Sequence, residues 1–107
     1  MSNTFKRAVL ANIDTALATV YTVPSTTTTV VIGLTLANIT ASSITASVQL
    51  ATAGDDTYIA KDIPLPVGSS VEIMAGNKIV MQTTDILKVS GSATNSVDAT
   101  MSYMEIV

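Results

Sequence analysis

The chain has 107 residues, of which 48% are apolar and 12% are charged, and its formal net charge is −3. It contains neither Cys nor His, which excludes disulfides, thiol nucleophiles, imidazole bases and nearly all structural zinc sites. Its five basic residues form no stripe that could bind a phosphate backbone. The sequence has no stretch of about 20 apolar residues, so no membrane span is predicted. We therefore expect a non-enzymatic domain with no catalytic, cofactor or metal site and no nucleic-acid, membrane or small-molecule partner.

Segments in which every second residue is apolar predict strands, because alternation places those residues on one face. In chain order the expected strands cover 5–13, 17–23, 29–40, 43–52, 57–63, 70–74, 78–83, 86–90 and 97–103. A short helix over the Ala-rich segment 14–20 competes with the second strand, but the β-branched residues that follow favour strand. The segment 29–40 is the most apolar, so we expect a central strand that is buried on both faces.

Turn residues separate these segments roughly every ten residues, a spacing typical of sandwiches and jelly rolls. The expected fold is all-β: an antiparallel, jelly-roll-like β-sandwich of about 8–9 short strands. Residues 1–13 are expected to form an N-terminal arm or edge strand, and residues 14–107 a single β-sandwich domain. Pro24 and Pro66 cannot donate to a ladder, so each should mark a strand boundary or a sheet edge.

Asp55 and Asp56 are the only two acidic residues adjacent in the sequence. Loop carboxylates of this kind can hold a calcium ion, but Asp also caps backbone amides in turns. Because no Asp-x-Asp spacing is repeated, the sequence favours turn chemistry over a calcium site.

The apolar residues that could bind ligands are better explained by packing. Single-stranded nucleic acids and sugars need aromatic platforms, and the aromatic residues here all lie in strand-like segments, where core or interface packing is more common. They are Phe5, Tyr21, Tyr58 and Tyr103. Met74, Met81 and Met101 are expected to fill gaps in a core that has few aromatic rings.

Sheet edges rich in uncharged Thr and Val pair with other chains unless they are guarded. The Thr run 26–29 and the last strand up to Val107 carry little charge, so we expect part of this surface to be covered in an oligomer. At the end of the last strand, Met104 and Ile106 move to the other parity, which predicts a bulge or cover on both faces. The candidate interface residues are Phe5, Lys6, Arg7, Val9, Tyr103, Ile106 and Val107.

The sequence also resembles small virion structural proteins of tailed bacteriophages, especially contractile-tailed phages of cyanobacteria. The similar phrases are NTFKR at 3–7, YTVP at 21–24 with VVIGL at 30–34, AKDIP at 60–64 with Pro66 and Gly68, and NSVD at 95–98 running to Glu105-Ile106. Similar proteins usually carry a Gly-Asp turn before the Ile-x-Lys-Val strand, whereas this chain has Thr84-Asp85 there. We expect this departure to change the type of turn and not the fold.

The resemblance implies a virion protein that is present in many copies and assembles in the host cytoplasm. Its most specific implication is a capsid decoration or cement protein, a homo-oligomer such as a trimer, which bridges neighbouring copies of the major capsid protein. A neck, tail or fibre-associated adaptor is the alternative. A glycan- or receptor-binding module is a third hypothesis, which the shortage of aromatic residues disfavours.

Overall fold

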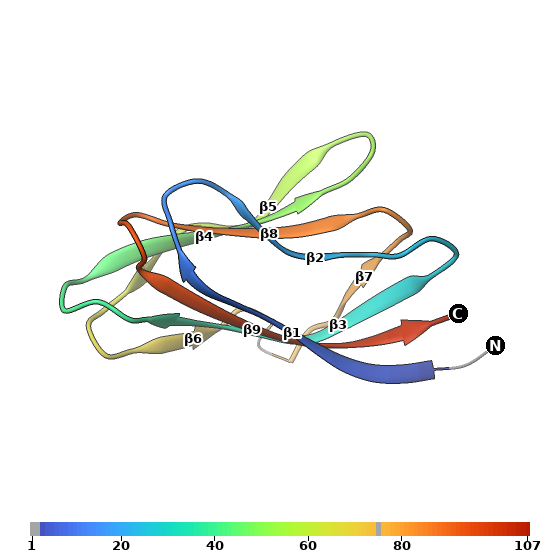
Figure 1. Ribbon diagram of the computed structural model, residues 1–107, viewed down its shortest axis with the longest axis horizontal. Helices are drawn as coiled ribbons and strands as arrows, with labels where there is room; N and C mark the ends of the chain where they lie inside the picture. The colour runs from blue at the N-terminus through green and yellow to red at the C-terminus, as the bar shows by residue number, and fades with distance from the viewer. Residues whose placement is uncertain (1–2, 75) are drawn as a thin grey trace.

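The computed structural model describes residues 3–74 and 76–107, and these residues form nine strands and no helix (Figure 1). The strands are β1 (Asn3–Ile13), β2 (Ala18–Thr22), β3 (Thr28–Asn38), β4 (Ile44–Ala51), β5 (Asp56–Leu65), β6 (Ser70–Glu72), β7 (Ile79–Met81), β8 (Ile86–Gly91) and β9 (Val97–Ile106). The expected all-β fold is therefore confirmed. Strand β2 begins within the segment 14–20, for which a short helix is the alternative prediction.

The strands form two antiparallel sheets. The five-stranded sheet has the order β1-β9-β3-β6, with β7 also pairing with β3, and the four-stranded sheet has the order β2-β8-β4-β5. Apart from the β4–β5 and β6–β7 connections, successive strands lie in opposite sheets. This order, in which the first and last strands are neighbours, is that of a jelly roll.

The core lies between the two sheets and follows the period-2 pattern of the strands. Along β9, every second residue from Val97 to Glu105 is buried. Val31, Leu34 and Val89 are completely inaccessible to solvent, and each fully buried side chain of this size contributes about 1.5–3 kcal/mol to folding. The expected burial of the three methionines at positions 74, 81 and 101 is confirmed.

Strand β3 differs from the expectation of a strand buried on both faces. Its inward residues are buried, but Ile32 is 39% exposed on the other side. The register with β9 shifts between Val31 and Gly33, so a bulge interrupts the ladder at this point. The expectation is wrong because no described segment of the chain covers the outer face of the five-stranded sheet.

The last strand is also not an edge. Strand β9 lies between β1 and β3 and pairs with both along nearly its whole length, so its backbone is already satisfied. Its alternation continues to the end of the strand, with Glu105 taking the inward position between Met104 and Ile106. In the Thr run, Thr27 and Thr29 are buried. The edges belong instead to β1 and the short β6 and β7 in one sheet, and to β2 and β5 in the other.

Pro24 and Pro66 lie at strand boundaries, as predicted. Thr84 stands where similar proteins usually carry a glycine, and it adopts a backbone conformation that favours glycine. Pro24 lies between β2 and β3, and Pro66 directly follows β5. Thr84 has φ of 71°, a left-handed conformation in which glycine is favoured and a β-branched residue is strained. The turn is nonetheless closed, because the backbone amide of Gln82 donates to the carboxylate of Asp85 over 3.0 Å.

Candidate assembly surface

The outer face of the five-stranded sheet carries a row of apolar side chains that crosses four strands. Phe5 of β1 pairs with Met104 of β9, Met104 pairs with Val30 of β3, and Val30 pairs with Val80 of β7. Residues paired across antiparallel strands point to the same face, so these four side chains lie side by side. Phe5 is 74% exposed and Val80 is 59% exposed. We call Phe5, Met104, Val30 and Val80 the apolar row.

Further apolar residues extend this surface on both sides of the row. Val9 has the same parity as Phe5 along β1 and is 64% exposed, and the half-buried Ile106 follows Met104 by two positions on β9. A broad open depression of about 400 Å³ lies beside the row and is lined by Phe5, Lys6, Arg7, Ile32, Ser102 and Tyr103. Its openness suits contact with a protein surface better than enclosure of a small molecule.

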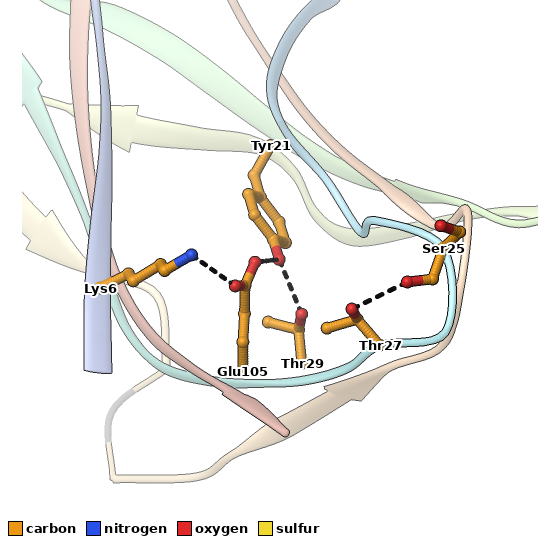
Figure 2. A network of polar contacts seen from close by, with 6 residues as sticks. All are labelled: Lys6, Tyr21, Ser25, Thr27, Thr29 and Glu105. Carbon is orange, nitrogen blue, oxygen red and sulfur yellow. Dashed lines mark hydrogen bonds and ion pairs between the residues drawn. The ribbon is translucent and has the colours of Figure 1, made fainter. Parts of the chain in front are cut away.

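On the inner side of the same strands, a polar network links the edge strand β1 to β9 beside it and to β2 in the opposite sheet (Figure 2). Glu105 of β9 is almost fully buried, and its Oε1 lies 2.8 Å from the Nζ of Lys6 on β1. The hydroxyl of Tyr21, from β2 in the opposite sheet, donates to Glu105 Oε2 over 2.5 Å. The hydroxyl of Thr29 on β3 lies 2.8 Å from the same phenol oxygen. Both carboxylate oxygens of a buried acid are thereby satisfied.

The network shifts the pKa values of its members in consistent directions. The hydrogen bonds from Lys6 and from Tyr21 hold the pKa of Glu105 below its usual range, against the opposing effect of burial. Burial, followed by the hydrogen bond to Glu105, raises the pKa of Tyr21. The ring of Tyr103 packs on that of Tyr21 with a centroid distance of 4.3 Å, and burial raises its pKa as well. Glu105 is thus held as an anion and Tyr21 as a neutral donor.

The structure brings together some of the candidate interface residues and separates others. Phe5, Arg7 and Val9 have the parity of the outer face of β1. Ile106 of β9 lies opposite Asn3 and is therefore a diagonal neighbour of Phe5, whereas Val9 lies opposite Thr100, further along the strand. The amine of Lys6 turns inward to Glu105, and Tyr103 is buried between the sheets. Val107 follows β9 and is 56% exposed.

Sequence reasoning missed Val30, Val80 and Met104 as parts of this surface. Their common face depends on the strand order, which brings β3, β7 and β9 together from distant parts of the chain. The off-parity position of Met104 was the one local signal.

Other clusters of polar residues serve the turns. The amide of Asp55 donates to the hydroxyl of Thr52 over 3.0 Å, and that hydroxyl donates back to the Asp55 carbonyl. The segment is therefore a turn, as expected, but the side chain that caps it is Thr52 and not an Asp carboxylate. Within 3–74 and 76–107, no three His, Cys, Asp or Glu side chains gather as a possible metal site. The same residues include no helix that is long and apolar enough to cross a membrane.

No protein-family model and no curated protein matches the chain. Solved structures that are similar to it include the following two. One comes from Bacillus endospore appendages, described as a family of disulfide-linked pili: it is 13% identical, with a TM-score of 0.59, over 96% of this chain and 87% of that chain. The other comes from infectious bursal disease virus, Gx strain: it is 12% identical, with a TM-score of 0.51, over 95% of this chain.

At these identities the likeness shows a shared β-sandwich fold. This chain spans 32% of the length of the viral chain. Neither structure is described as a protein of a tailed bacteriophage, so the resemblance to virion proteins of those phages stays a prediction.

Proposed function

We propose that this protein is a structural subunit that acts by binding other protein surfaces, and specifically that it is a virion protein that decorates the outside of a bacteriophage capsid. The observation that carries the proposal is the apolar row on the outer face of the five-stranded sheet. Large contiguous apolar patches on soluble domains mark sites of association. Here the patch lies over four neighbouring strands and is covered by no other described part of the chain.

The surface is also suited to binding because it is already formed in the single chain. The ion pair between Lys6 and Glu105 and the donation from Tyr21 tie β1 to the strands behind it. A face that is rigid before contact loses less conformational entropy on association. An interface of standard size covers about 800 Å² of each partner, an area that the outer face of a five-stranded sheet can provide.

The two similar structures support an assembly role without specifying the particle. One belongs to appendages described as disulfide-linked pili, and the other is part of the structure of a virus. This chain has no cysteine, so subunits of it would be held by non-covalent contacts. Many such contacts on one lattice give avidity that a single contact lacks.

The test is the copy number of the protein in purified particles of the phage that encodes it, measured by quantitative mass spectrometry against the major capsid protein. Decoration predicts on the order of hundreds of copies per particle, because the protein then follows the capsid lattice. About a dozen copies would overturn decoration in favour of the neck or tail. Absence from the particle would overturn the assignment to a virion.

A further inference from the structure

Two long strands have an open edge, one in each sheet. Strand β1 (Asn3–Ile13) has β9 as its only ladder neighbour, and β5 (Asp56–Leu65) has only β4. The other edges in the described parts of the chain are short, since β2 has five residues and β6 and β7 have three each. Long open edges present rows of unpaired amide and carbonyl groups that can bind another strand.

Strand β1 carries few of the features that guard an edge. From Asn3 to Leu10 it pairs with β9 in an unbroken register, and the bulge lies beyond this stretch. The stretch contains no proline, and its only charges are Lys6 and Arg7. Arg7 is exposed and forms no ion pair with any described residue.

These charges argue against pairing of β1 with the same strand of a second copy. Antiparallel pairing that uses the whole stretch 3–10 places Lys6 opposite Arg7 of the other copy, twice. Like charges directly opposite one another destabilise a strand pair. A strand with acidic residues is the better complement.

Strand β5 offers such a complement at its beginning. Asp56 to Tyr58 pair with β4 in regular register, before two irregularities further along. Asp56 is exposed and has no ion pair within the described residues, and Asp55 precedes it. Lys61 is directed elsewhere, since its amine lies 4.7 Å from the centre of the Tyr58 ring. Figure 1 shows the β4–β5 turn standing away from the rest of the sandwich, where a second molecule can reach it.

We propose that β1 of one copy adds to the open edge of β5 in a second copy, with Arg7 placed beside Asp56. The inference rests on the proposed function, because it specifies how subunits meet. Strand addition supplies affinity through main-chain hydrogen bonds, and the side chains supply selectivity. Because the two edges are different surfaces of the same molecule, the contact is head-to-tail and produces an open chain or a closed ring.

The test is a charge exchange in the full chain, followed by sedimentation velocity over a concentration series. Arg7→Glu and Asp56→Arg should each weaken association about tenfold, because attraction is replaced by repulsion. The double variant should recover wild-type association. Lys78→Glu is the matched control, since it changes the net charge by the same amount as Arg7→Glu at an exposed site outside both edges.

Mixing the two single variants distinguishes this contact from others. In the mixture, the β1 edge of each variant meets a β5 edge of opposite charge on the other variant, whereas each variant alone offers only like charges, so the mixture should recover association that neither variant shows alone. If the wild type associates but neither single substitution weakens it, the edge pairing is wrong and the proposed function stands. If the wild type stays monomeric at all concentrations, the edge pairing is overturned, and the copy number in purified particles decides the proposed function separately.

Discussion

Replacement of Glu105 by Gln tests the network that fixes β1. The substitution keeps the size and shape of the side chain and leaves an oxygen that can accept from the Tyr21 hydroxyl. It removes the negative charge that Lys6 contacts at 2.8 Å. The side chain of Lys6 is 49% exposed, so its amine can return to water and no buried cation is left behind.

The expected loss follows from the change in hydrogen-bond type. A hydrogen bond to a charged group contributes about 1.5–3 kcal/mol, and a bond between neutral groups about 0.5–1.5 kcal/mol. Because Glu105 is buried and bonded to Tyr21, Glu105→Gln should lower the free energy of unfolding by about 1–2 kcal/mol at neutral pH.

The pH dependence of this stability difference follows from the pKa of Glu105. The folded-state pKa of Glu105 lies below its ordinary value of 4.5, so the stability that it contributes is complete above that value and is lost as the pH falls through the folded-state pKa. Urea unfolding of both proteins at pH 7 and at about pH 3 should therefore show a smaller difference at the lower pH. An equal difference at both pH values, or none at pH 7, would refute the reasoning.

Three further substitutions test the turns and the packing by urea unfolding. Gly91→Ala should destabilise the fold by about 1–3 kcal/mol, because the added carbon overlaps the Ser96 hydroxyl and lies 3.0 Å from Val97 Cγ2; Ser96→Ala in the same chain should restore part of the loss, and no recovery would contradict the stated clash. Thr84→Gly should stabilise by about 1 kcal/mol, because φ is 71° there, and a loss of stability would show that this turn is unstrained. Asn38→Ala should cost about 2–3 kcal/mol, because the buried amide donates to three backbone carbonyls; a neutral result would mean that water replaces those bonds.

The strands could be predicted from the sequence because their periodicity is local. Alternation located β9 and β4 closely, and the prolines marked the ends of β2 and β5. The choice between helix and strand over 14–20 depends on tertiary pairing, since β2 is held by β8 from the other end of the chain. Propensity alone could not resolve that choice.

The surface could be predicted only in part, because it depends on which strands are neighbours. Phe5 and Val9 are apolar in an edge strand, and that much is visible in the sequence. The burial of Glu105 is not, because its partner Tyr21 is 84 positions away. Ile32 was expected inside because apolar residues surround it, yet the face on which it lies has no cover within the described chain.

The most direct test of the central claim is the association state of the purified protein, measured by sedimentation equilibrium up to about millimolar concentration. If the apolar row is an interface, the wild type associates in the micromolar range, and Phe5→Ser and Val80→Ser each weaken that association. Val67→Ser, at a site 54% exposed in a turn, should leave it unchanged. A wild type that stays monomeric throughout, or an equal effect of Val67→Ser and Val80→Ser, would contradict the account.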